Sequence, residues 1–299
     1  MSNWAGKKVT ILGLGRSGVS SAMYLKQRGA QVLISEKSAL DAGKEAEAGK
    51  LRKQGIEVES GEHSEKAIKS ADLIIISPGI PPSSEVVQRA HAQGKEVICD
   101  IELAYRERGK TQIIGITGTN GKSTTCALTS YILEHCDLTA PACGNFGIPI
   151  LSQLESNPDY LVAEVSSYQL HYCPAFAPII GVWLNLTPDH IEWHGGIAGY
   201  IADKKKMFLN QREDQYAVLN QDDEVVAEFK PPSEIFPFAV HHDMESAVQG
   251  AFLSEDFLCY RIDGATKVLC GRDELKIIGD HNVENALAAL SVAALLHLD

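Results

Sequence analysis

The sequence predicts an α/β protein of two domains, each built around a mainly parallel sheet. Short apolar runs alternate with polar stretches of helical character along the first hundred residues, and a second alternating series begins near residue 112. The chain has 299 residues, of which 44% are hydrophobic, so it is long enough to form two cores. We place the first domain at residues 1–98 and the second at residues 99–299.

The first domain is expected to be Rossmann-like. Its strand-like runs lie at residues 8–14, 31–35, 73–77 and 96–100, and helical stretches lie at residues 17–28, 39–54 and 84–93. The glycine-rich turn GLGRSG, Gly13 to Gly18, follows the first strand, where such a turn usually binds a dinucleotide. Glu36, at the end of the second strand, fits the ribose contact of a nicotinamide site.

The second domain opens with a helical stretch at residues 101–110. Strands are expected at residues 112–117, 160–165, 178–186 and 216–220, and turn-separated runs between residues 234 and 271 predict an extra small antiparallel sheet. A helical pattern covers residues 280–299 and reaches the last residue without a capping glycine. We therefore expect the chain to end where a further element would begin.

Composition excludes several classes of function. The formal charge of -12 opposes wide nucleic-acid binding, and no run approaches the roughly 20 apolar residues of a membrane span. The seven cysteines are scattered without a Cys-x-x-Cys pair, which argues against a disulfide framework and a thiolate zinc site. We expect a cytoplasmic protein that binds neither nucleic acid nor membrane.

A second glycine-rich turn, GTNGKSTT from Gly118, has the order that a phosphate site requires. An apolar strand precedes Gly118 and Gly121, and Lys122 with Ser123 and Thr124 opens a helix, so backbone N–H groups and the lysine would face a triphosphate. Ile116 stands where the strict P-loop has its first glycine, so this loop is a variant. We expect Ser123 or Thr124 to reach a magnesium ion.

Polar groups that could complete a metal site follow this loop. Glu164 ends a strand at the sheet edge where α/β proteins bind ligands, and DHIEWH offers Asp189, His190, Glu192 and His194 in an order that disfavours a hydrolytic zinc site. Of the three consecutive lysines from Lys204 to Lys206, one can point inward, because successive helical residues lie about 100° apart. A desolvated amine can react with carbon dioxide and become a carbamate that binds magnesium.

Together these motifs resemble the Mur ligases. The matching stretches are GLGRSG, SPG (Ser77 to Gly79), GTNGKST, CGNFGIP, EVSSYQL, NLTPDHIEWHG, YIADKKKMF and GDHNVENALAA, in the family's order and across nearly the whole chain. The resemblance implies an ATP-dependent ligase of peptidoglycan precursor synthesis that acts as a monomer. It favours the family member that adds D-glutamate to UDP-N-acetylmuramoyl-L-alanine through an acyl phosphate.

The resemblance also implies residue roles. The catalytic residues would be Lys122, Glu164, His190 and Lys204, and two magnesium ions would be held by Ser123, Glu164, His190 and a carbamylated Lys204. ATP would be bound by Gly118, Thr119, Asn120, Gly121, Lys122, Ser123, Thr124, Asn282 and Asn285. The UDP substrate would be bound by Gly15, Arg16, Ser17, Gly18, Ser35, Glu36, Lys37, Ser77, Pro78, Gly79, Asn145, Ser167 and His190. Which of Lys204, Lys205 and Lys206 carries the carbamate stays open.

In the family a C-terminal domain closes over ATP and holds D-glutamate, and the resemblance implies that it would begin near residue 299. We expect the 299-residue chain to bind the UDP-sugar but to have little ligase activity. Three alternatives remain open. The chain could be a different Mur-type ligase, a folylpolyglutamate synthase, or a nicotinamide-binding sensor or dehydrogenase based on GLGRSG and Glu36. The second of these lacks a domain like residues 1–98.

Overall fold

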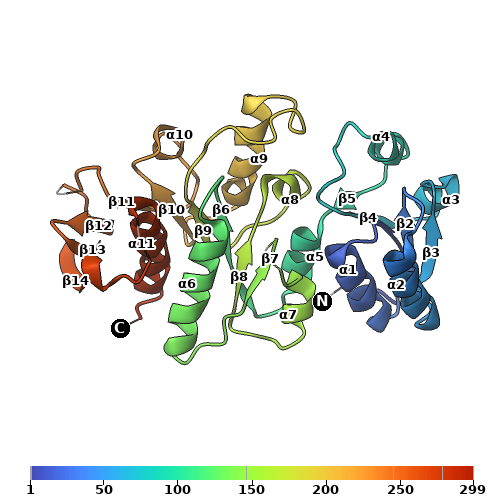
Figure 1. Ribbon diagram of the computed structural model, residues 1–299, viewed down its shortest axis with the longest axis horizontal. Helices are drawn as coiled ribbons and strands as arrows, with labels where there is room; N and C mark the ends of the chain where they lie inside the picture. Colours follow the sequence, from blue (N-terminus) through green and yellow to red (C-terminus); the bar gives the residue numbers. More distant parts are fainter. Residues whose placement is uncertain (1, 146, 245, 278, 299) are drawn as a thin grey trace.

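The chain forms two separate β-sheets, each flanked by helices, which confirms the predicted α/β class (Figure 1). The computed structural model describes residues 2–145, 147–244, 246–277 and 279–298. No helix within these ranges is both long enough and apolar enough to cross a lipid bilayer.

The first sheet has five parallel strands in the order β3-β2-β1-β4-β5. Its strands are β1 (Lys8–Leu12), β2 (Gln31–Glu36), β3 (Glu57–Ser60), β4 (Leu73–Ile76) and β5 (Val97–Ile98), and its helices are α1 (Arg16–Gln27), α2 (Ala42–Lys53), α3 (Glu65–Lys69) and α4 (Glu85–Ala92). The strand order reverses direction between β1 and β4, and ligands of such sheets bind beyond the carboxyl ends of the strands at that point. The GLGRSG turn follows β1 there.

The second sheet has nine strands in the order β14-β13-β12-β11-β10-β9-β6-β8-β7. These strands are β6 (Gln112–Thr117), β7 (Ala142–Gly144), β8 (Tyr160–Glu164), β9 (Ile180–Trp183), β10 (Tyr216–Asn220), β11 (Glu234–Ala239), β12 (Gly250–Ser254), β13 (Phe257–Ile262) and β14 (Ala265–Gly271). Neighbours from β7 to β12 are parallel, whereas β13 is antiparallel to both β12 and β14. Of the strands between residues 234 and 271, where an extra antiparallel sheet was expected, β13 and β14 are antiparallel and β11 and β12 pair in parallel, and all four continue the main sheet at its far edge.

Helices cover the second sheet, and two of them meet at the loop between β6 and α6. They are α5 (Asp100–Glu107), α6 (Lys122–His135), α7 (Ile150–Leu154), α8 (Ser167–His171), α9 (Ile197–Leu209), α10 (Glu224–Ala227) and α11 (Asp280–Leu295), with a 3₁₀ turn at Arg272–Glu274. In Figure 1, α6 and α11 lie side by side, and their buried apolar residues share one core with the central strands. The shared core fixes the N-terminal turn of α11 beside the loop that opens α6.

The end of α11 differs from the sequence prediction. The helix ends at Leu295 rather than at the last residue, and residue 299 lies outside the described residues. His297 takes a left-handed conformation with φ 54°, and the N–H groups of His297 and Leu298 bond to the carbonyls of Ala294 and Ala293. This is the pattern of a Schellman cap, so a residue other than glycine closes the helix.

The two sheets meet through the segment that follows β5. Cys99 donates its backbone N–H to the carbonyl of Tyr172, and its thiol lies 3.2 Å from the carbonyl of Gln169. Tyr172 in turn donates its hydroxyl to the carbonyl of Ile80, 3.2 Å away. Because Tyr172 and Gln169 lie at α8, this helix contacts both halves of the molecule.

Candidate functional site

The loop between β6 and α6 has the backbone that a phosphate site requires. Gly121 precedes the first residue of α6 with φ 82°, in the left-handed region, and a Cβ at this position would collide with the side-chain oxygen of Asn285. No side chain caps α6, and its first turn carries no acidic residue. The free N–H groups of this helix end are therefore available to an anion.

Side chains hold this loop in place from two directions. Lys122 folds back so that its Nζ donates to the carbonyls of Gly118 and Thr119, at 3.1 and 2.8 Å. Asn185 accepts the N–H groups of Thr119 and Asn120 through its Oδ1, at 3.0 and 2.9 Å. The Thr119 hydroxyl lies 3.0 Å from the hydroxyl of Tyr200. Asn185 and Tyr200 were not predicted as site residues, although both lie in stretches that carried the resemblance.

Glu164 is the buried acidic group of the site. Its side chain lies at the end of β8, with the residue only 3% exposed. Ser123 donates its hydroxyl to one carboxylate oxygen and Asn145 donates its amide to the other, both at 2.7 Å. Two residues from separate motifs thus converge on Glu164, and both contribute uncharged donors.

Lys204 is the lysine of the triple run that points inward. It is 1% exposed, and its Nζ donates to the carbonyl of Gly118 at 2.8 Å. Burial, together with the nearby charge of Lys122, lowers the pKa of Lys204 to about 7. Lys205 instead lies over the ring of Phe229, and Lys206 pairs with Asp203. The amine of Lys204 is therefore the one placed beside the glycine loop.

His190 is the exposed member of the predicted metal ligands. Its side chain is 61% exposed, 3.4 Å from Asp189 and in ring contact with Tyr168. Within the described ranges, no cluster of three or more His, Cys, Asp or Glu side chains has the arrangement of a metal site. Of the four predicted metal ligands, Ser123 and Glu164 are in direct contact, and Lys204 joins them only through the glycine loop.

Asp203 was not predicted, yet three side chains bond to its carboxylate. It accepts from the Nδ1 atoms of His171 and His194 at 2.9 and 2.7 Å, and Lys206 lies 2.9 Å away. Burial raises the pKa of Asp203, but the bonds from His171, Lys206 and His194 outweigh it and lower the pKa to about 2. The Nε2 of His194 lies 3.0 Å from the hydroxyl of Ser167, a predicted substrate residue.

The two predicted asparagines of α11 reach the same loop. Asn285 accepts the hydroxyl of Thr125 at 3.1 Å and donates to the side chain of Asn282 at 3.2 Å. Its side-chain oxygen also lies next to Gly121, where it would collide with a Cβ at that position. Asn285 thus lies at the N-terminal end of α6, where the sequence-predicted ATP residues gather.

The first glycine loop opens onto a cavity of about 820 Å³. Gly13 has φ 102°, and a Cβ there would press against the hydroxyl of Ser77 from the next strand end. That hydroxyl is buried and has no hydrogen-bond partner among the residues described, as expected where a ligand supplies the partner. The predicted residues that line the cavity are Gly15, Glu36, Lys37, Ser77 and Gly79.

Glu36 and Ser35 are already engaged by the protein. Glu36 accepts the N–H of Leu14 at 3.0 Å and pairs with Lys44 at 3.2 Å. Burial raises the pKa of Glu36, but the N–H groups of Leu14 and Ser38 and the Lys44 ammonium lower it below its usual value. Ser35 is fully buried, and its hydroxyl bonds to Glu59 and to His63, which lines the cavity. Ser35 therefore lies behind the cavity wall and does not line it.

A smaller cavity of about 220 Å³ joins the two halves of the molecule. The first half contributes Gly15, Arg16, Ser17, Ser77 and Pro78, and the second half contributes Gly144, Asn145, Gly147, Pro149 and Gln169. Arg16 also donates to the carbonyl of Gly147 at 3.3 Å. The structure therefore brings Asn145 together with the predicted residues of the first glycine loop.

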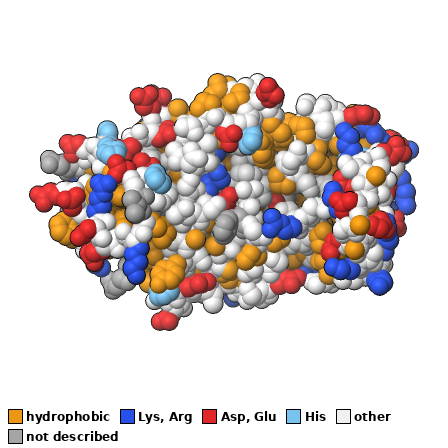
Figure 2. Space-filling model, in the orientation of Figure 1, with side chains coloured by type: hydrophobic (Ala, Val, Ile, Leu, Met, Phe, Trp, Pro, Cys, Tyr) orange, Lys and Arg blue, Asp and Glu red, His pale blue; other side chains and the backbone are white. Residues whose placement is uncertain are grey.

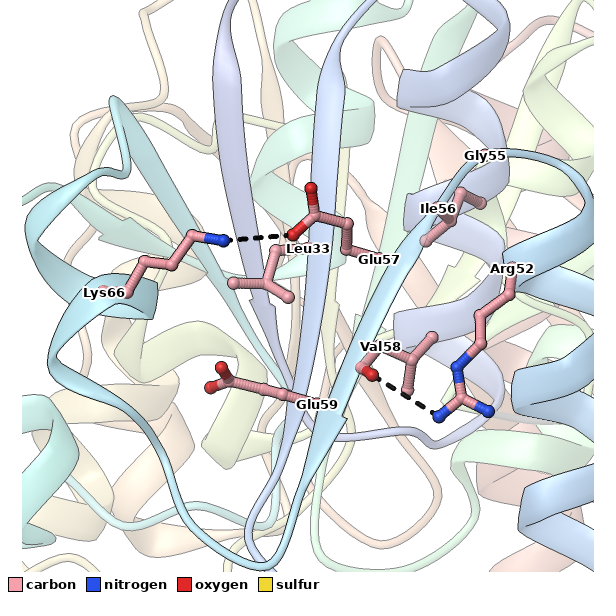
Figure 3. Close-up of a pocket in the computed structure, with 8 residues that line it drawn as sticks. All are labelled: Leu33, Arg52, Gly55, Ile56, Glu57, Val58, Glu59 and Lys66. Atoms are coloured by element: carbon pink, nitrogen blue, oxygen red, sulfur yellow. Dashed lines mark hydrogen bonds and ion pairs between the residues drawn. The ribbon is translucent and has the colours of Figure 1, made fainter.

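A third hollow, at the outer strand β3, contains none of the predicted site residues. Figure 3 shows Lys66 paired with Glu57 at 3.4 Å and Arg52 on the carbonyl of Val58, and Glu59 bonds to Ser35 and Ser64. Over this end of the molecule, acidic and basic side chains alternate at the surface (Figure 2). The hollow carries no functional assignment.

Two family descriptions match the chain. "Mur ligase MurD-like, N-terminal domain" matches residues 7–99, and "Mur ligase middle domain" matches residues 116–293.

Curated relatives named UDP-N-acetylmuramoylalanine–D-glutamate ligase are similar along the whole chain. The protein from Acidobacterium capsulatum is 39% identical over 298 residues, which cover 97% of this chain and 63% of the relative. The protein from Pelotomaculum thermopropionicum is 36% identical over 307 residues, which cover 100% of this chain and 66% of the relative. The chain thus spans slightly less than two thirds of the length of these relatives.

Solved structures share the fold at low identity. A crystal structure of UDP-N-acetylmuramate:L-alanyl-gamma-D-glutamyl-meso-diaminopimelate ligase from Neisseria meningitides has a TM-score of 0.65 at 19% identity, covering 99% of this chain and 95% of that one. A murein peptide ligase from Psychrobacter arcticus has a TM-score of 0.61 at 17% identity, covering 98% and 66%. These two likenesses describe the fold alone.

Proposed function

The chain belongs to the Mur ligase family, and from this premise we propose that it acts in the ATP-dependent ligation of D-glutamate to UDP-N-acetylmuramoyl-L-alanine. The relatives of this name are longer than the region they share with the chain, so the reaction of the whole protein is part of the proposal. The product would be a peptidoglycan precursor, made from nucleotide substrates in the cytoplasm by a monomer.

The observation that carries the proposal is the arrangement of two glycine loops, one at each sheet. The loop at Gly118 has an uncapped helix end, the Lys122 amine and a buried carboxylate, which suits a nucleoside triphosphate. The loop at Gly13 opens onto the larger cavity, and the smaller cavity leads from it to Asn145. A nucleotide-sugar bound at the first loop could therefore extend its amino-acid end toward the second.

We assign residues 1–98 to the UDP-sugar and residues 99–299 to ATP. Ser77, with its unpartnered hydroxyl, and the backbone of Gly15 to Gly18 would contact the diphosphate. Asn145 and Ser167 would lie near the reacting carboxylate. Lys122 would contact the outer phosphates of ATP, and Asn282 and Asn285 would contact its adenine side.

Magnesium fits the donors around Glu164. The carboxylate is buried, Ser123 and Asn145 bond to it as neutral donors, and the Ser123 hydroxyl is an oxygen ligand of the kind that Mg²⁺ prefers. Ser123 and Glu164 would hold one ion, and His190 with a carbamylated Lys204 would hold a second. Bound magnesium supplies charge neutralisation on the phosphate oxygens.

The chemistry explains why these groups lie together. The alanine carboxylate is a poor electrophile, so it attacks the γ-phosphate of ATP, forming an acyl phosphate and releasing ADP. The amine of D-glutamate then attacks the acyl carbon, an amide bond forms, and phosphate leaves. Lys122 and the N–H groups of the loop would stabilise the charge that develops on the phosphate during the first step.

The nicotinamide alternative is less well supported. In that reading Glu36 would bind a ribose hydroxyl, but its carboxylate already accepts the Leu14 N–H and pairs with Lys44. The unpartnered hydroxyl of Ser77 does not distinguish the two ligands, because both carry a diphosphate with acceptor oxygens.

Calorimetric titration of the chain with UDP-N-acetylmuramoyl-L-alanine, ATP with magnesium, and NADH tests the assignment. We expect the nucleotide-sugar and ATP to bind independently and NADH to give no heat. Lys122→Ala should abolish ATP binding and leave nucleotide-sugar binding intact, whereas Ser77→Val should have the reverse effect. Tight NADH binding without a nucleotide-sugar signal would overturn the proposal. Phosphate release with all three substrates then tests turnover.

A further inference from the structure

The Asp203 carboxylate joins three elements next to the proposed site. His171 comes from the end of α8, His194 from the loop before α9, and Lys206 from α9 itself, and all three lie within 3.0 Å of its oxygens. Each of these partners can donate a hydrogen, and Lys206 is cationic. Asp203 is therefore an acceptor on every contact.

This arrangement determines which nitrogen of His194 carries hydrogen. Because the carboxylate can only accept, the Nδ1 of His194 must donate to it across 2.7 Å. In the neutral imidazole the Nε2 is then an acceptor, and the hydroxyl of Ser167 donates to it across 3.0 Å. The hydroxyl of Ser167 therefore donates its hydrogen to His194, and its oxygen can only accept any further hydrogen bond.

Aromatic rings keep His194 in this orientation. Its side chain is fully buried, stacks on Tyr168 with ring centroids 5.4 Å apart and an interplanar angle of 3°, and contacts the rings of Trp193 and Tyr200. These contacts fix the plane of the ring, and a 180° flip within that plane would put carbon atoms where the two nitrogens bond, so both hydrogen bonds would break. The hydrogen bonds and ring contacts therefore hold Asp203, His194 and Ser167 in one arrangement.

The positions of Asp203, His194 and Ser167 in the fold relate them to the proposed reaction. Ser167 lies three residues after Glu164, at the first turn of α8. Asp203 immediately precedes Lys204, which contacts the glycine loop. The proposed function places Ser167 near the reacting carboxylate, and His194 and Asp203 link this serine by hydrogen bonds to the segment that carries Lys204.

We propose that Asp203 and His194 are positioning residues that make Ser167 a pure hydrogen-bond acceptor for the amide N–H of the substrate's terminal amino acid. The proposal rests on the proposed function, because it needs the N-acylated amino acid of the nucleotide-sugar in the cavity. It assigns Asp203 and His194 a role in orienting the carboxylate that is to be activated, through Ser167 and without contact to the reacting atoms.

The first experiment measures the tautomer directly. Imidazole ¹⁵N NMR spectra of the ¹⁵N-labelled chain without ligand should show His194 protonated at Nδ1 and unprotonated at Nε2. In Asp203→Asn the new amide can donate to Nδ1, so His194 should change to the Nε2–H form and force Ser167 to accept. An Nε2–H tautomer in the wild type would overturn the proposal.

The second experiment measures binding of UDP-N-acetylmuramoyl-L-alanine and of UDP by calorimetry. Asp203→Asn and Ser167→Ala should each weaken the first ligand about tenfold, the effect of one misdirected or lost hydrogen bond, and leave UDP unchanged. The double variant should be no weaker than either single variant, because both remove the same interaction. Additive losses, or equal losses for UDP, would overturn the positioning role.

Lys206→Met is the matched control, because it removes another partner of Asp203 but leaves the bond to His194. It should change substrate affinity by less than about twofold, even if the melting temperature falls. A loss as large as that of Asp203→Asn would show that Asp203 acts only by packing α9, and would overturn the proposal.

If the wild type binds UDP but not the nucleotide-sugar, the proposed function fails, and the role of Ser167 fails with it. The tautomer spectra remain a separate result.

Discussion

The buried amine of Lys204 is a destabilising feature that the site can use. In the folded chain its pKa is about 7, against 10.5 for an unperturbed lysine. The amine is therefore partly neutral at physiological pH, and only a neutral amine reacts with carbon dioxide. Burial of this residue next to Gly118 supports the proposed carbamate at Lys204 rather than at Lys205 or Lys206.

Lys204 should make stability rise with pH. Between pH 7 and 10.5 the unfolded chain binds more protons at this lysine than the folded chain, so the free energy of unfolding should increase by up to about 1.4 kcal/mol per pH unit. Below pH 7 both states are protonated and the penalty is complete. Urea unfolding from pH 6 to 9.5 in bicarbonate-free buffer should show this slope, and Lys204→Met should lack it.

Lys205→Met is the control for that measurement and should keep the wild-type slope. Equal slopes in wild type and Lys204→Met would contradict the lowered pKa. In bicarbonate buffer, intact mass measured under gentle conditions should show one added carbon dioxide in the wild type, and none in Lys204→Met.

Glu164 should favour function at the expense of stability. Its carboxylate is buried against two neutral donors, so Glu164→Gln should raise the free energy of unfolding by about 1 kcal/mol by removing a charge that is poorly solvated. The same change should remove most of the effect of magnesium on ATP affinity, while leaving ATP binding without metal unchanged. Thermal unfolding and calorimetry with and without Mg²⁺ measure both effects. A destabilised variant with normal magnesium dependence would refute this view of Glu164.

At the scale of elements, the start of α6 depends on one backbone conformation. Gly121→Ala should destabilise the chain by about 1–3 kcal/mol, because φ 82° is unfavourable for alanine and its Cβ would meet Asn285. ATP affinity should fall as the loop shifts. Gly49→Ala within α2 is a matched control, since nothing lies within 4 Å of its added Cβ, and it should stabilise the chain by up to about 1 kcal/mol. Denaturant unfolding of both variants measures the contrast, and equal effects would argue against strain at Gly121.

The helices between the apolar strands of the first domain were predictable from sequence. The expected helices at residues 17–28, 39–54 and 84–93 are present as α1, α2 and α4, with ends shifted by one to three residues. Strand β3 was missed because its sequence EVES is polar and none of its residues is buried, and β7 was missed because it has only three residues. Both lie at sheet edges, but only β3 lacks buried residues, whereas β7 is largely buried and too short to show a periodic pattern.

The site was predictable where its residues form local motifs. Ser123, Glu164 and Asn145 come from three recognisable stretches, and the structure brings them into contact. Asp203 could not be found in this way, because its importance arises from partners on α8 and in the preceding loop that only the fold brings together. Asn185 likewise lies more than 60 residues from the backbone groups that it holds.

At the scale of the whole molecule, the small cavity is lined by residues from both halves, so a ligand bound in it should contact both halves. Gly15 to Ser17 line it from one side, and Gly144 and Asn145 line it from the other. A nucleotide alone would fill the large cavity at the first sheet, whereas a ligand that also carries a muramoyl-alanine group would reach across. Only the longer ligand should therefore make contacts with both halves.

Amide hydrogen exchange can detect this difference. UDP should slow exchange at the Gly13–Gly18 loop alone, whereas UDP-N-acetylmuramoyl-L-alanine should also slow exchange in peptides containing Gly144 and Asn145, because a ligand that contacts both sides must be released before either side opens. Asn145→Ala should abolish the second effect and leave the first. If UDP already slows exchange at Asn145, or if UDP-N-acetylmuramoyl-L-alanine does not, the amino-acid end of the substrate does not lie in this cavity.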